Sequence, residues 1–167
     1  MRLALLRAPL PGWRMALAHK VGAALDHTQW SHGEIVFSDR ITGSAWLDGG
    51  VALRRMPDAH YEADRWDYFD LPDGLEPAAR RWFADNSGKP YDVLGPARFA
   101  LGILSQTADR WYCHEATAEA LGLPDSWRWT GGMFVAMGPR LWPGEFKRVP
   151  APWYTPPPSQ FMRCSRD

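Results

Sequence analysis

Short apolar runs dominate the chain between residues 31 and 71. The clearest, Ile35-Val36-Phe37 within 31–39, is bounded by polar residues, which predicts a strand. Runs of similar character follow at 44–47, 51–55 and 66–71. Residues 40–43 and Asp48-Gly49-Gly50 separate the first three runs and have the composition of hairpin turns. The pattern predicts a meander of antiparallel strands over residues 31 to 71.

Helical spacing appears on both sides of this region. Apolar residues recur at every fourth position at Trp13, Leu17, Val21 and Leu25, which predicts a helix over 12–25. Further helices are expected over 75–86, the second half of 91–104, and 113–121. Residues 2–8 predict a first strand, and the aromatic, glycine-rich stretch 127–137 predicts no clear element. Strands grouped together with helices on both sides predict an α+β fold.

The length of 167 residues fits a single domain, 1–167, that can bury its own core. A proline-dense stretch begins at Pro143, so 143–167 is expected to form an extended C-terminal arm over the surface. An apolar content of 46% argues against disorder, and a net charge of zero argues against nucleic acid or an anionic membrane as the main partner.

Targeting signals are not evident in the sequence. No apolar stretch is long enough to span a bilayer, and the first ten residues lack the features of a signal peptide. The expected location is the cytoplasm, or delivery without a signal as a phage or prophage component. The sequence leaves the oligomeric state open.

The candidate nucleophile is Cys113, one of only two cysteines. It follows two aromatic residues and opens the helix expected at 113–121. The unpaired N–H groups and the helix dipole at a helix N-terminus favour thiolate over thiol, and thiolate is the reactive form. A cysteine in this position is also compatible with an inert core residue. The other cysteine, Cys164, lies in the terminal tail, and two cysteines do not make a disulfide framework.

The candidate base is His32, which titrates near neutral pH and can move a proton to and from the thiol. Positions i and i+2 of a strand share a face, so Glu34 would point the same way as His32, while Gly33 lets another element approach from behind. Glu34 is the preferred third residue to orient the imidazole. Ser44, on the expected partner strand, is the alternative. The candidate catalytic residues are therefore Cys113, His32 and Glu34.

A His-x-Glu motif with a later cysteine also occurs in zinc-dependent deaminases. Here the second half of that motif is missing, because Ala116 stands where a ligand is needed three residues after Cys113. No metal and no cofactor are therefore expected. Three aromatic residues close to the expected helix or preceding it are candidates for substrate binding: Tyr91, Trp111 and Tyr112.

Four short motifs occur in an order that is typical of one family. They are Ser31-His32-Gly33-Glu34 with the apolar strand after it, Gly49-Gly50-Val51, Gly88-Lys89-Pro90-Tyr91-Asp92, and Tyr112-Cys113-His114-Glu115. This series resembles the circularly permuted branch of the NlpC-type papain-like cysteine peptidases, many of them phage or prophage proteins. His114 departs from the serine that usually follows the nucleophile.

The resemblance implies a permuted papain-like fold, a small antiparallel meander or barrel packed against helices, with the nucleophile at a helix N-terminus. It also implies that Cys113 and His32 act as nucleophile and base in cleaving an amide, for instance in a cell-wall peptide. The same branch resembles lecithin:retinol acyltransferase-type enzymes. An acyltransferase or thioesterase acting on a lipid-like acyl group, and a non-catalytic assembly or binding module, therefore remain open beside the peptidase.

Overall fold

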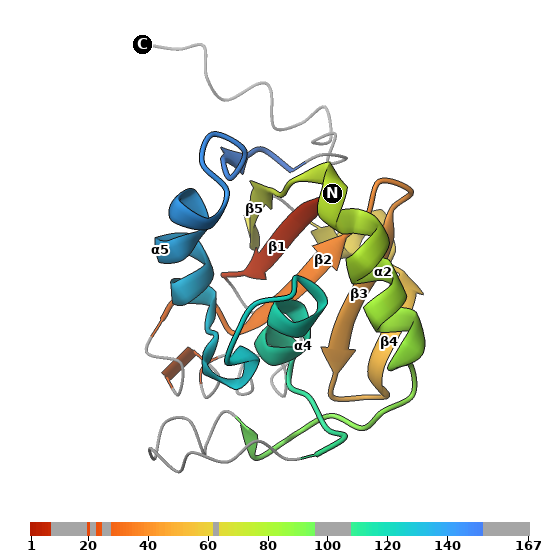
Figure 1. Cartoon of the computed structure of the whole chain (residues 1–167). Coiled ribbons are helices and arrows are strands. Elements are labelled where there is room, and N and C mark those ends of the chain that lie inside the picture. The colour runs from red at the N-terminus through yellow and green to blue at the C-terminus, as the bar shows by residue number, and fades with distance from the viewer. Residues whose placement is uncertain (8–19, 21–22, 25–27, 62–63, 96–107, 152–167) are drawn as a thin grey trace.

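The computed structural model of the chain describes residues 1–7, 20, 23–24, 28–61, 64–95 and 108–151 (Figure 1). The helix predicted over 12–25 lies mostly outside the described residues. So do most of the helical half of 91–104 and the arm beyond residue 151. The described part of the chain combines an antiparallel sheet with helices, which confirms the α+β class.

In the described part of the chain, six strands form one antiparallel sheet: β1 (Arg2–Leu6), β2 (His32–Val36), β3 (Ile41–Trp46), β4 (Gly50–Arg55), β5 (Trp66–Asp70) and β6 (Arg148–Val149). Their spatial order is β4-β3-β2-β1-β5-β6. Strand β3 begins three residues earlier than predicted, because Thr42 and Gly43 pair with both β2 and β4. The tight turn before it occupies residues 38–40 rather than 40–43.

The predicted meander over 31–71 is correct only for β2, β3 and β4. Strand β5 does not follow β4 in space, because β1 inserts between β2 and β5 and pairs with both along its whole length. The first strand of the sequence is therefore central, and the described strands form an open sheet with β4 and β6 at its edges rather than a closed barrel.

Successive side chains of a strand point to opposite faces of the sheet, and in this sheet both faces receive apolar side chains. Leu3, Leu5 and Ile35 belong to the larger core cluster, which includes helix residues. Ala4, Leu6 and Val36 belong to a second cluster completed by Tyr61, Trp66 and Tyr68. The sheet is thus buried on both sides, which explains why the central strand β1 is apolar at successive positions.

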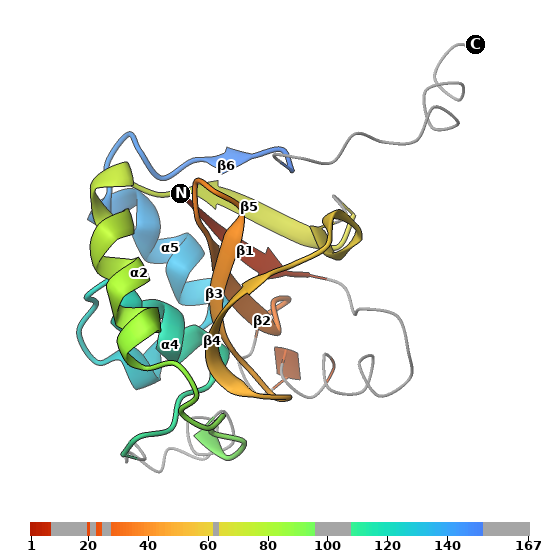
Figure 2. The same cartoon turned by 90° about the vertical axis from the view of Figure 1, so that its right-hand side faces the viewer.

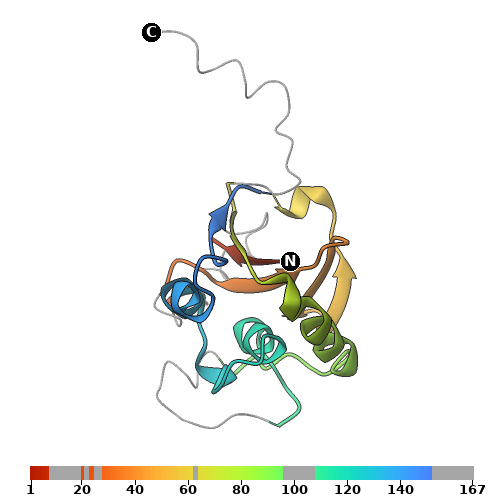
Figure 3. The same cartoon turned by 45° about the horizontal axis from the view of Figure 1, so that its top comes forward.

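Three helices of the described residues cover the face of the sheet that carries the larger core cluster: α2 (Glu76–Asp85), α4 (Cys113–Ala120) and α5 (Gly131–Leu141). Figure 2 shows all three on the same side of the sheet, and Figure 3 shows α4 lying between α2 and α5. They contribute Phe83, Ala116 and Phe134 to the core, and each of these side chains is fully buried. The sequence predicted α2 and α4 correctly but not α5.

Shorter elements complete the described structure. The 3-10 helix η1 (Asp58–Tyr61) lies in the loop before β5, while η2 (Asp73–Leu75) and η3 (Ser126–Arg128) precede α2 and α5. The first residues of the predicted arm add β6 to the edge of β5, through the pairs Tyr68–Val149 and Phe69–Arg148. None of the helices in the described part of the chain has the length and apolar character needed to cross a membrane.

Candidate active site

Helix α4 begins at Cys113, directly after an extended residue, Tyr112, at the N-cap position. The side chain of Glu115 turns back toward the start of the helix, where its Oε2 accepts the backbone N–H of Tyr112 at 3.4 Å. The carboxylate therefore satisfies the helix start, as expected for an acidic residue in the first turn. The helix start directs the first backbone N–H groups toward the space beyond residue 113.

The position of α4 depends on the glycine that follows His32. A Cβ atom added to Gly33 would lie 2.8 Å from Cδ2 of His114, so a larger residue would push α4 away from β2. A Cβ atom on Gly131 would lie 3.5 Å from Nε2 of the same ring. His114 is 1% exposed and fills the space between β2 and α5. The prediction that Gly33 admits another element is confirmed.

The sulfur of Cys113 lies beside the first residues of β2. Its Sγ is 3.9 Å from the carbonyl oxygen of Ser31, and the residue is 3% exposed. The ladder between β2 and β3 comprises the pairs Ile35–Gly43 and Val36–Thr42, at the far end of β2. The start of α4 therefore meets β2 at its His32 end, outside this ladder.

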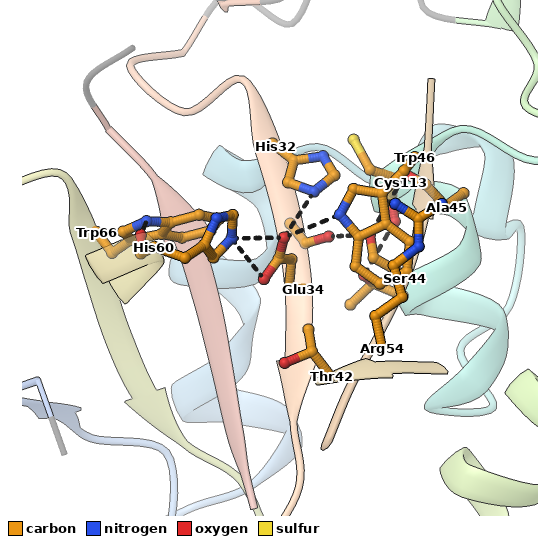
Figure 4. Close-up of polar contacts among 12 residues, drawn as sticks. His32, Glu34, Thr42, Ser44, Ala45, Trp46, Arg54, His60, Trp66 and Cys113 are labelled. Atoms are coloured by element: carbon orange, nitrogen blue, oxygen red, sulfur yellow. Dashed lines mark hydrogen bonds and ion pairs between the residues drawn. The ribbon is translucent and has the colours of Figure 1, made fainter. Parts of the chain in front are cut away.

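His32 lies between Cys113 and Glu34. Its Nε2 is 3.1 Å from Oε1 of Glu34, and in Figure 4 its other ring nitrogen faces the Cys113 sulfur. Burial alone would lower the pKa of His32, but the charge of Cys113 and hydrogen bonds to Cys113 and Glu34 outweigh burial and raise it to about 10. The three residues that the sequence singled out are therefore in one interacting group, with the imidazole held as the cation.

Glu34 is fully buried, yet its carboxylate accepts from more partners than His32. The Trp46 indole N–H donates to Oε1 at 3.2 Å, and the Tyr61 hydroxyl donates to Oε2 at 2.9 Å. His60 Nε2 lies 3.1 Å from Oε1 and 3.3 Å from Oε2. Figure 4 shows His32, His60 and Trp46 on different sides of the carboxylate, with His60 opposite Trp46.

These donors keep Glu34 ionised. Burial would raise the pKa of Glu34, but hydrogen bonds from His32 and His60 and their charges outweigh burial and bring the pKa far below its usual range. Burial and the nearby carboxylate raise the pKa of Tyr61, so its hydroxyl keeps its proton and donates. An ionised carboxylate can only accept, which means that both histidines present an N–H at Nε2.

Three of the residues around Glu34 were not predicted: Trp46, His60 and Tyr61. Trp46 could have been found, because it stands two positions after Ser44 on the same strand and so shares its face. His60 and Tyr61 lie in a loop with no periodicity, and only a histidine and an aromatic residue in an otherwise polar stretch mark them. The Ser44 hydroxyl donates to the carbonyl of Gly33 at 2.7 Å, while Glu34 contacts the His32 ring directly.

The three aromatic residues predicted to bind substrate lie on the chain that leads into α4. Tyr91 and Trp111 form an isolated β-bridge. The Trp111 ring packs edge-on against the Trp82 ring, with the ring centroids 5.7 Å apart. The Tyr112 hydroxyl donates to the carbonyl of Trp127 at 2.7 Å. These contacts anchor the segment before the nucleophile, and a role in substrate binding stays a prediction.

In the described ranges, no group of three or more His, Cys, Asp and Glu side chains has an arrangement that could hold a metal ion. A cavity of about 550 Å³ lies at the other end of β2, with Val36, Phe37 and Ser38 in its lining, and shares no residue with the Cys113 group.

Comparison with protein-family models and with curated proteins gives no match for this chain. The resemblance drawn from the four motifs therefore stays a prediction, and it is the geometry around Cys113 that carries a functional argument.

Proposed function

We propose that the chain is a cysteine hydrolase that cleaves an amide bond through a thioester acyl-enzyme. The observation that carries this proposal is the position of the His32 ring, which interacts with the Cys113 thiol on one side and the buried Glu34 carboxylate on the other. Nucleophilic catalysis by a thiol needs this combination of an ionised sulfur, a base in contact with it, and a group that orients the base.

The reaction begins with the pair in its charged form, Cys113 as thiolate and His32 as imidazolium. The thiolate attacks the amide carbonyl, and backbone N–H groups at the start of α4 stabilise the oxyanion. His32 gives its proton to the leaving amine, and the carbon–nitrogen bond breaks to leave a thioester on Cys113. His32 then takes a proton from water, the resulting hydroxide attacks the thioester, and the carboxylic acid leaves as Cys113 is restored.

Glu34 acts through His32 in this scheme. Its negative charge stabilises the imidazolium, and its hydrogen bond at Nε2 leaves Nδ1 for the sulfur. The order of the elements, with the histidine strand before the nucleophile helix, is the order of the permuted NlpC-type fold that the motifs resemble. That resemblance favours a peptide substrate, such as one from a cell wall, and a setting in a phage or prophage.

The reactivity of Cys113 toward iodoacetamide as a function of pH tests the proposal most directly. The Cys164→Ser background leaves Cys113 as the only thiol. We expect alkylation to persist well below the pH of about 8.5 at which an ordinary thiol ionises. We also expect His32→Ala to return the midpoint of the pH–rate profile of alkylation toward that pH, since it removes the cation beside the sulfur.

Ser126→Ala is the matched control, because it removes a side-chain hydrogen bond of a buried residue, from the Ser126 hydroxyl to Oε1 of Glu119 near the C-terminal end of α4. The proposal is wrong if Cys113 titrates as an ordinary thiol and His32→Ala changes nothing. If the thiol is activated, amide, ester and acyl-transfer substrates then separate a peptidase from an acyltransferase or thioesterase. Lack of thiol activation would favour the assembly module.

A further inference from the structure

A second histidine contacts the carboxylate that orients His32. His60 approaches Glu34 from η1, with its Nε2 3.1 Å from Oε1 and 3.3 Å from Oε2. It therefore spans both oxygens, whereas His32 contacts Oε1 alone. Glu34 has three rotatable side-chain bonds, so the direction of its carboxylate depends on the donors around it.

The His60 ring is itself held in place. Its side chain is 10% exposed, and it packs against Tyr61 with ring centroids 4.8 Å apart and against Trp66 with centroids 5.0 Å apart. The Trp66 indole donates to the backbone carbonyl of His60 at 2.6 Å. Packing and a backbone hydrogen bond thus fix the donor before it meets the carboxylate, as preorganised supporting groups do.

We propose that His60 is a positioning residue of this site, which holds the Glu34 carboxylate so that the His32 ring keeps Nδ1 toward Cys113. The inference rests on the proposed function, because it concerns how the thiol is activated. Without the His60 donor, Oε2 would keep the Tyr61 hydroxyl, and the carboxylate could turn away from the His32 ring. Among the described residues, the titratable groups in contact with the His60 ring are Glu34 of β2 and Tyr61 of η1, while His32 contacts the same Glu34 and Tyr68 of β5 packs against the same Tyr61.

The test compares His60→Leu with His60→Gln in the Cys164→Ser background. Leucine keeps an apolar side chain of moderate size and removes the donor, while glutamine returns an amide N–H at a similar reach. We expect His60→Leu to move the midpoint of the pH–rate profile of Cys113 alkylation upward by about one unit, which slows alkylation about tenfold at a pH well below both midpoints. We expect His60→Gln to restore most of the rate. Ser126→Ala measures the effect of a side-chain hydrogen bond lost away from the site.

Each outcome separates the two proposals. An ordinary thiol in the unsubstituted chain overturns the proposed function itself. An activated thiol that needs His32 but is unchanged by His60→Leu overturns the role of His60 alone. Equal losses in His60→Leu, His60→Gln and Ser126→Ala also overturn it, since they show a purely structural effect.

A measurement on the unsubstituted chain covers the case in which His60→Leu does not fold. Nitrogen-15 NMR of the imidazole rings reports which nitrogen carries the proton. We expect a proton on Nε2 of His60, with a signal that moves in Glu34→Gln. A neutral His60 ring protonated only at Nδ1 would contradict the proposal, because such a ring cannot donate to Glu34 from Nε2.

Discussion

At the scale of single residues, the Glu34 carboxylate is the group on which the candidate site depends. It is fully buried and accepts hydrogen bonds from four side chains, three of them nitrogen donors and one a hydroxyl. A buried charge is tolerated only when its lone pairs are filled in this way. The same donors make the carboxylate available as a fixed negative charge beside His32.

Glu34→Gln removes that charge while it keeps the size of the side chain. An amide also carries an N–H2 group, which would face the N–H donors of His60 or Trp46 and break at least one of these contacts. We expect the His32 pKa to fall and kcat/KM for an amide substrate to drop roughly 100-fold. Steady-state kinetics with circular dichroism on the same sample checks this. A variant as active as the unsubstituted chain would show that Glu34 does not orient His32.

The residue scale also shows what the sequence could predict about the site. Cys113, His32 and Glu34, which the structure brings together, could be singled out because their signals are local: a cysteine before a run of helix formers, and two polar side chains two positions apart on a strand. Trp46, His60 and Tyr61 reach the carboxylate across other elements. Such contacts depend on strand pairing and on where a loop folds, which no local pattern specifies.

At the scale of elements, period and turn signals predicted β2 to β5, α2 and α4. The helix α5 was missed because Gly131, Gly132 and Gly138 weaken helical propensity. The Thr130 hydroxyl nevertheless caps it by accepting the backbone N–H of Met133 at 3.2 Å. The glycines also permit close packing, since a Cβ on Gly131 or Gly132 would lie 2.6 Å from Trp30 or Thr28. Packing thus overrides propensity here.

The contact between β3 and α2 gives a prediction at this scale. The fully buried Phe83 ring covers Gly43, where an added Cβ would lie 2.4 Å from Cδ2 of the ring. We expect Gly43→Ala to lower the free energy of unfolding by about 1–3 kcal/mol, because the ring must move within a packed core. Thermal unfolding checks this, with a fall of about 2–4 °C per kcal/mol.

Gly74→Ala is the matched control for that substitution. Gly74 lies in η2 at an exposed position, and an added Cβ would meet nothing within 4 Å. We expect its unfolding temperature to stay close to that of the unsubstituted chain. Equal unfolding temperatures for Gly43→Ala and Gly74→Ala would contradict the tight packing of α2 on β3.

At the scale of the whole molecule, the site makes stability depend on pH in two directions. The pKa of His32 is raised from 6.5 to about 10, so its stabilising contribution is complete below 6.5 and is lost as the pH rises to about 10. The pKa of Glu34 is lowered from 4.5, so its contribution is complete above 4.5 and is lost as the pH falls below that value. The two contributions overlap most fully between pH 4.5 and 6.5.

We therefore expect the urea concentration at half-unfolding to decrease as the pH rises above this interval in the unsubstituted chain. It should decrease less in His32→Gln, which has no group to deprotonate at this position. Glu34→Gln should likewise flatten the acid side. Urea unfolding followed by tryptophan fluorescence at a series of pH values measures both limbs. Parallel curves for the unsubstituted chain and His32→Gln between pH 6.5 and 10 would contradict the raised pKa of His32.

The α+β class was predictable because composition and period determine it, but the order of the strands was not. The central position of β1 depends on pairing between residues more than sixty positions apart, such as Ala4 with Tyr68. Local patterns carry no information on such pairing, and a meander was the simplest arrangement of the strand signals. The sequence predicted β1 outside the meander, whereas the structure has β1 between β2 and β5.

This central position of β1 has a consequence for the time course of folding. Strand β1 precedes both of its partner strands in the chain, so it cannot be paired on both sides until β5 is available. Helix α4 follows later still in the chain. Contacts of such long sequence separation form late, because long loops must close first. We therefore expect Cys113 to gain its His32 partner only after most of the sheet is assembled. On this order of events, Cys113 has only the reactivity of an ordinary thiol while the chain folds, and it is activated as one of the last events.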